Sequence, residues 1–219
     1  MTSQINTDNI RVYAQNCIRL ETKSGTVLYF DPFHMQEAPY DADYVFFTHA
    51  HYDHFSPEDI AKVAKTGTTF IAPASMEAEI DQIESASVAY LRPGDTCKFS
   101  DFSVEAVPAY NIAEERLGFH PRENAWVGYV VTVDGIRYYI AGDTDHNEDT
   151  ETVSCDVALV PIGGTYTMDP EQAAAFINTI EPHIAIPTHY GSIVGTMADF
   201  DTFAALVDPA IEIARKLER

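Results

Sequence analysis

The pattern of apolar and polar residues predicts a chain made of short strands and a few helices. Alternation predicts strands over 10–20 and 26–30, joined by a turn at 23–25. Short, wholly apolar runs predict buried strands at 44–47 and 157–160. Further strands are expected at 68–71, 88–91, 96–99, 102–107, 127–133, 136–140 and 184–186.

Helices are predicted where capping residues precede helix-forming segments. Ser56 followed by proline and two acids marks the start of a helix ending near Lys65, and Asp169 resembles the cap of a helix over 170–180. The tail from Ile211 fits either a strand or a helix, while 108–126 is predicted to be an irregular loop. Two more helices are expected, at 74–83 and 199–207.

Strands grouped early and late, with helices between them, predict two sheets with helices on the outside. The 219 residues suffice for one generous core, and neither a linker nor a repeat divides them, so we expect a single domain over 1–219. A hydrophobic content of 46% is ordinary for a soluble globular protein.

The net charge narrows the range of partners. Thirteen basic and 34 acidic residues give 13 − 34 = −21, and a field of that sign repels phosphate backbones and anionic membranes. We therefore expect a small-molecule substrate and no nucleic acid. An anionic substrate remains possible where bound cations dominate the local field.

Cysteine spacing and the lack of long apolar runs bear on the compartment. Cys17, Cys97 and Cys155 are far apart and form no C-x-x-C pair, which indicates reduced thiols rather than a disulfide framework. Neither a cationic apolar leader nor a run of about 18 apolar residues is present, so no membrane span is expected. We predict a cytoplasmic protein, and a homo-oligomer is possible.

The strongest chemical signal follows the apolar run 44–47, where three imidazoles and a carboxylate occupy six residues in the pattern H-x-H-x-D-H. These groups are preferred ligands of zinc and similar divalent ions. In an extended segment His49 and His51 would point the same way and could bind one ion together. Asp53 and His54 could then reach a second ion.

Two later residues have the placement that further ligands would need. Asp143 lies in Gly-Asp-Thr after the strand 136–140, where the glycine would let the backbone approach an ion. His189 lies in Pro-Thr-His after the strand 184–186. Each motif is weak alone, but both follow buried strands, so we expect them at the same sheet edge as the histidine motif.

Together these motifs resemble the metallo-β-lactamase superfamily: H-x-H-x-D-H at 49–54, G-D-T at 142–144 and P-T-H at 187–189, in that superfamily's order. Asp-Pro-Phe at 31–33 and Pro-Ile-Gly-Gly at 161–164 are similar to its small hydrolases related to lactonases and N-acyl-phospholipid phosphodiesterases. The resemblance covers nearly the whole chain. It implies an α+β fold, a four-layer αββα sandwich of two mixed sheets with metals at one edge.

The resemblance also implies which residues bind metal. Asp31 would orient the histidine loop, although a turn residue before proline explains it equally well. The implied ligands are His49 and His51 for a first ion, Asp53, His54 and His189 for a second, and Asp143 as a bridge between them.

One departure from that pattern concerns the first ion. The superfamily usually supplies a third histidine from the loop after 102–107, where this chain has Asn111. His120, nine residues on, could replace it, Asn111 or water could complete the site, or the first ion could be weakly held. His120 could also contact substrate without binding metal. We expect one firmly held ion at the second position and an exchangeable one at the first.

The predicted function is metal-dependent hydrolysis of an ester, lactone, amide or phosphodiester in a small molecule. One or two divalent ions, zinc first with manganese or iron as alternatives, would activate a water that Asp53 orients. Two alternatives remain: a diiron-type redox enzyme, and a degenerate metal-binding protein without turnover.

Overall fold

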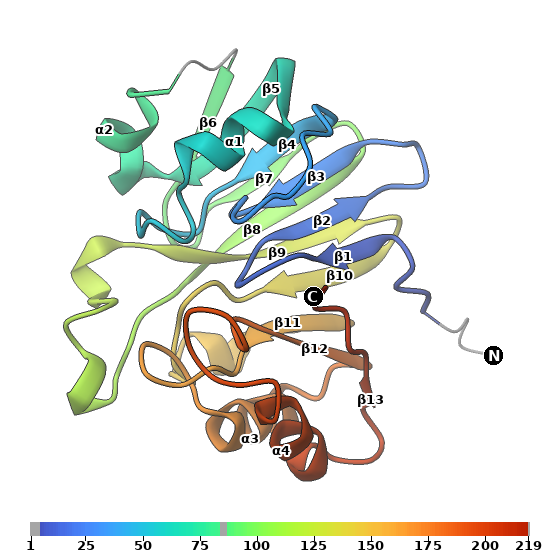
Figure 1. Cartoon of the computed structure of the whole chain (residues 1–219), viewed down its shortest axis with the longest axis vertical. Helices are drawn as coiled ribbons and strands as arrows, with labels where there is room; N and C mark the ends of the chain where they lie inside the picture. The colour runs from blue at the N-terminus through green and yellow to red at the C-terminus, as the bar shows by residue number, and fades with distance from the viewer. Residues whose placement is uncertain (1–4, 84–86, 219) are drawn as a thin grey trace.

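The computed structural model describes residues 5–83 and 87–218, and its first sheet contains six strands whose spatial order follows the chain (Figure 1). Neighbouring strands among the first three are antiparallel, and each later strand runs parallel to the one before it. The strands are β1 (Ile10–Val12), β2 (Ile18–Glu21), β3 (Val27–Phe30), β4 (Ala42–Phe46), β5 (Ala64–Pro73) and β6 (Ser87–Leu91).

The second sheet contains seven strands in the reverse spatial order, from β13 to β7. It is also mixed, because β7 to β10 are antiparallel and β10 to β13 are parallel. The strands are β7 (Thr96–Lys98), β8 (Phe102–Pro108), β9 (Val127–Val133), β10 (Ile136–Ile140), β11 (Val157–Pro161), β12 (Ile184–Thr188) and β13 (Glu212–Ile213).

The helices lie on the outer faces of the sheets, two on each (Figure 1). Helices α1 (Pro57–Val63) and α2 (Glu77–Ile80) pack on the first sheet, and α3 (Pro170–Ile180) and α4 (Asp199–Leu206) on the second. Within the described residues, no helix has the length and apolar character that crossing a bilayer would require. Short 3₁₀ turns complete the elements: η1 (Ala74–Met76), η2 (Glu114–Arg116), η3 (Arg122–Asn124) and η4 (Thr150–Thr152).

Apolar side chains fill the space between the sheets and beneath both pairs of helices. Between the sheets, the rings of Phe30 and Phe46 stack with centroids 4.5 Å apart, and Tyr129 meets Phe46 edge-on at 5.2 Å. Burial of such rings is a main source of folding free energy. These layers confirm the predicted four-layer αββα sandwich of two mixed sheets.

Several predicted elements differ from the observed ones. The segment 10–20 is not one strand, because the chain reverses between β1 and β2, with Gln15 at φ +48°. The helix predicted over 74–83 is only η1 and α2. In the tail from Ile211, which fitted either a strand or a helix, the two residues of β13 form a strand and no helix follows within the described residues. The hairpin strands β9 and β10 and the helix α3 have the predicted bounds.

Candidate metal centre

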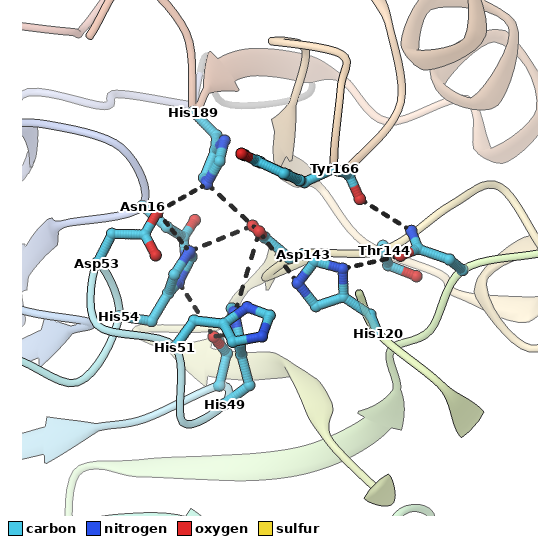
Figure 2. A network of polar contacts seen from close by, with 12 residues as sticks. Asn16, His49, His51, Asp53, His54, His120, Asp143, Thr144, Tyr166 and His189 are labelled. Carbon is cyan, nitrogen blue, oxygen red and sulfur yellow. Dashed lines mark hydrogen bonds and ion pairs between the residues drawn. The ribbon is translucent and has the colours of Figure 1, made fainter. Parts of the chain in front are cut away.

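Segments leaving the ends of five strands converge at one edge of the sandwich (Figure 2). Asp31 follows β3 and the loop 49–54 follows β4, both in the first sheet. In the second sheet, the loop 109–126 follows β8, Asp143 follows β10, and His189 directly follows β12. Both sheets therefore contribute side chains to the centre.

The loop after β4 brings its histidines together by a turn rather than by an extended strand. The backbone N–H groups of His54 and Phe55 donate to the His51 carbonyl at 2.9 and 2.8 Å. Although the expectation of an extended segment is wrong, Nε2 of His49 still lies 3.1 Å from Nδ1 of His51. His49 and His54 are buried, with ring centroids 4.0 Å apart, while His51 is half-buried.

Asp143 lies at the middle of the centre (Figure 2). Its carboxylate oxygens lie 3.3 Å from Nε2 of His54, of His120 and of His189. Around it, potential ligand atoms form three overlapping groups, each with its atoms within 4.8 Å of one another: His49, His51 and His120; His49, His54 and Asp143; Asp53, His54 and His189. All of the candidate ligands implied by the sequence thus meet in space.

Unpartnered buried atoms test whether these residues suit a metal. Although His54 and His120 face the Asp143 carboxylate at 3.3 Å, Nε2 of His54, Nε2 of His120 and Oδ1 of Asp143 are buried and form no hydrogen bond among the described residues. The opposite ring nitrogen of each histidine is bonded, Nδ1 of His54 to Asp31 at 2.7 Å and Nδ1 of His120 to Asn111 at 2.8 Å. Because unsatisfied buried polar atoms are costly, free atoms converging on one point fit a cation.

Asp31 connects the histidine loop to the turn after β3. Its carboxylate accepts from the Thr48 N–H at 2.8 Å, the Thr48 hydroxyl at 2.6 Å and the Asn16 amide at 2.7 Å, besides contacting His54. Its backbone also forms the turn before proline, with φ +44°. Asp31 therefore both contacts the histidine loop, as the resemblance implied, and forms the turn before proline.

Where the superfamily usually supplies a third histidine, this chain has a contact between Asn111 and His120. The Asn111 Oδ1 can only accept, so Nδ1 of His120 donates to it and leaves Nε2 toward Asp143. The Asn111 Nδ2 donates to the Tyr166 carbonyl at 3.1 Å. Both ends of the amide are thus engaged within the protein, and His120 is the residue placed where a third histidine would be needed.

The electrostatics of the centre favour a bound cation. Burial raises the pKa of Asp143, but His189 and His54 outweigh it and hold that pKa well below its usual range. Against the same opposing burial, His189 and His54 lower the pKa of Asp53 to about 2. Burial, and next the charge of His54, hold the pKa of His49 well below its usual range. Against opposing burial, Asp143 and Asp31 raise the pKa of His54 well above its usual range. The buried carboxylates thus attract positive charge to the centre, which a bound divalent ion would supply in place of a proton.

Two buried amides belong to the centre although no motif indicated them. Nε2 of Gln15 lies 3.4 Å from Oδ2 of Asp53 and 3.1 Å from Nε2 of His189, and the Gln15 carbonyl accepts from the His189 N–H at 2.9 Å. Asn16 contacts Asp31. The only sequence signal is that two consecutive amides interrupt an apolar pattern expected to be one strand.

Trp126 and Gly142 also lie beside the histidine loop of the metal centre. The Trp126 ring centroid lies 5.0 Å from those of His49 and His51 and 5.8 Å from that of His120. A Cβ at Gly142, which has φ +63°, would lie 2.9 Å from the Thr48 Cβ. The glycine therefore makes room for the side chain next to His49, whereas we expected it to allow approach to an ion.

Comparisons with known proteins agree with this geometry. A family model of the beta-lactamase superfamily domain matches residues 9–189. A UPF0173 metal-dependent hydrolase of Thermoplasma acidophilum is 34% identical over 170 residues, covering 75% of this chain and 72% of the relative. One from Oenococcus oeni is 29% identical over 226 residues, covering 93% and 95%. A crystal structure described as a metal-dependent hydrolase, from Parabacteroides distasonis, has 30% identity and a TM-score of 0.81 over 95% of this chain and 93% of that one.

The chain belongs to the beta-lactamase superfamily, as its motifs predicted. Within that superfamily it is a metal-dependent hydrolase.

Proposed function

We propose that this hydrolase cleaves an ester, lactone or phosphodiester bond of a small molecule with divalent cations bound at the centre. The observation that carries the proposal is the set of unpartnered, buried nitrogen and oxygen atoms converging around Asp143. The proposed ligands are His49, His51 and His120 at one position, Asp53, His54 and His189 at the other, and Asp143 between them.

Bound divalent ions lower the pKa of water and polarise the bond to be cleaved. The chain's own groups position the reactants. Asp53 stays ionised because its pKa is lowered to about 2, so its carboxylate can accept a hydrogen bond from the attacking water and orient it. Gln15, beside Asp53, restricts the orientation of that carboxylate.

The proposed metal is zinc, because imidazole and carboxylate donors are its common ligands, with manganese or iron as alternatives. The second position combines a carboxylate with two buried histidines, whereas the first uses His51, which is half-buried, and His120 from a long loop. This asymmetry supports firm binding of one ion at the second position and exchange of the other.

The test is a His54→Ala variant, because His54 belongs to two of the three ligand groups. Wild-type protein should contain at least one metal per chain by elemental mass spectrometry. It should also hydrolyse bis(4-nitrophenyl) phosphate, 4-nitrophenyl acetate or dihydrocoumarin. The variant should lose both the metal and the turnover. His183→Ala is the matched control, because that side chain is 69% exposed and lies outside the centre.

Full turnover after exhaustive chelation would contradict the proposal. Metal binding without turnover on any of the three bond types would favour the degenerate metal-binding alternative. Visible absorbance from iron in anaerobically purified protein would instead favour the diiron redox alternative.

A further inference from the structure

Tyr166 lies beside the metal centre on the connection from β11 to α3. Its carbonyl accepts from the Asn111 amide at 3.1 Å, and the same amide contacts His120 at 2.8 Å. Its ring meets Phe119 edge-on with centroids 4.7 Å apart. Two independent contacts thus attach Tyr166 to the segment that carries His120.

The hydroxyl of Tyr166 points toward His189 and Asp143 in Figure 2. The ring is only partly buried, and its hydroxyl has no hydrogen-bond partner among the residues that the structure describes. A phenol directed at a reaction centre, with no contact of its own to satisfy, is available to a bound substrate.

The backbone before Tyr166 adopts a costly conformation. Gly164 has φ +67° and Thr165, a β-branched residue, has φ +60°. Such a conformation is unfavourable for a residue other than glycine and persists only where its surroundings impose it. Here the Gly164 N–H donates to the Met168 carbonyl at 3.0 Å and the Tyr166 N–H to the Gly164 carbonyl at 2.7 Å, so the turn fixes the position of Tyr166.

We propose that Tyr166 is a catalytic residue whose hydroxyl donates a hydrogen bond to the substrate oxygen that gains negative charge as water attacks. The inference rests on the proposed hydrolytic function and adds a donor that the ligand motifs do not contain. In this role the hydroxyl donates a hydrogen bond without transferring its proton, so it adds no charge to a centre already rich in carboxylates. Removing one donor of this kind typically lowers kcat by roughly 10²–10³-fold.

The test compares Tyr166→Phe with Tyr40→Phe, a control that removes the hydroxyl of a tyrosine 59% exposed and outside the centre. The Tyr166 contact with Asn111 uses the backbone, so Tyr166→Phe should fold normally and keep the wild-type metal content. With bis(4-nitrophenyl) phosphate or 4-nitrophenyl acetate, kcat should fall at least about tenfold while KM changes little. Tyr40→Phe should match wild type.

A second measurement is independent of turnover. Inorganic phosphate, titrated calorimetrically into the metal-loaded proteins, should bind Tyr166→Phe at least about fivefold more weakly than wild type, because one hydrogen bond to an anion is lost. Wild-type kcat and wild-type phosphate affinity in a metal-loaded Tyr166→Phe would overturn the inference. Loss of metal from this variant would also overturn it, since Tyr166 would then act through the ligands. Wild-type protein without metal or turnover would refute the proposed function itself.

Discussion

At the scale of single residues, two imidazoles of the centre are oriented by the group bonded to the far side of the ring. Asp31 contacts Nδ1 of His54, and Asn111 accepts from Nδ1 of His120, which leaves both Nε2 atoms directed inward. Such supporting contacts fix the tautomer and the direction of a ligand and raise its basicity. The residues that hold the histidines should therefore matter almost as much as the histidines.

Asp31→Asn should weaken both the metal site and the fold. The carboxylate has no exposed surface and accepts from three donors besides contacting His54, and an amide cannot replace all of these contacts. We expect metal affinity to fall about 10–100-fold and the free energy of unfolding by about 2–4 kcal/mol. Metal titration and urea denaturation measure the two effects. Asp8→Asn, on an exposed surface, is the control, and equal losses in both variants would refute the role of Asp31.

The single tryptophan offers a spectroscopic reading of the first metal position. Trp126 contacts all three histidines of that group, with centroids between 5.0 and 5.8 Å. Paramagnetic Co²⁺ should therefore quench its fluorescence strongly on binding, and His120→Ala should lose the quenching. A fluorescence titration measures this, and diamagnetic Zn²⁺ provides the control for changes in conformation. An unchanged Trp126 fluorescence when Co²⁺ fully occupies the centre would contradict the assignment of this position.

At the scale of elements, close contacts between backbone segments determine where the ligands lie. The turn after β11 passes so near the segment after β12 that a Cβ at Gly163 would collide with the His189 carbonyl oxygen. His189 itself has φ +57°, and its N–H is bonded to the Gln15 carbonyl. The ligand is thus located by neighbouring turns as well as by its own strand.

Gly163→Ala should displace His189 and impair the second metal position. The added methyl group must move backbone, and overpacking of this kind costs about 1–3 kcal/mol. We expect a Tm several degrees lower and a clear loss of metal affinity, measured by differential scanning fluorimetry and metal titration. Gly118→Ala is the matched control, because a Cβ there meets no atom within 4 Å. A Gly163→Ala protein with unchanged metal affinity would disprove the positional argument.

Local signals account for the elements that the sequence predicted well. Helix α3 begins with a capping box of Asp169 and Gln172, with Pro170 as its first helical residue. The β9–β10 hairpin turns at Asp134-Gly135. The break between β1 and β2 was missed because its turn, closed by the Cys17 N–H donating to the Ala14 carbonyl at 2.7 Å, contains no glycine or proline. The candidate ligands other than His120 were recognisable from their motifs and from the resemblance that these carry, while His120 was one of several alternatives. The amides and Trp126 were not recognisable, since their roles arise only when separate strands meet.

At the scale of the whole molecule, the centre joins the two sheets. His49 and His54 extend from the first sheet, and Asp143 and His189 extend from the second. Ions bound at the two positions, with Asp143 between them, would connect the two halves of the sandwich across one edge. Because such an ion binds the folded chain and not the unfolded one, it should contribute to stability by mass action.

Removal of metal should therefore lower thermal stability as well as activity. Free metal at 1,000 times its Kd adds about 4 kcal/mol, which corresponds to roughly 8–16 °C in Tm for a domain of this size. Differential scanning fluorimetry with and without a chelator measures the shift. His183→Ala should show the same shift as wild type, and His54→Ala should show almost none. An identical Tm for wild type with and without chelator would show that the centre holds no stabilising ion.

The position of His120 on the long segment 109–126 has a final consequence. The other candidate ligands lie on or near strand ends, but this one depends on how that segment is arranged, and the same segment places Phe119 against Tyr166. Occupancy of the first position and the placement of Phe119 against Tyr166 are then thermodynamically linked. A molecule that favours the arrangement seen here must strengthen ion binding, and the ion must strengthen binding of that molecule by an equal factor.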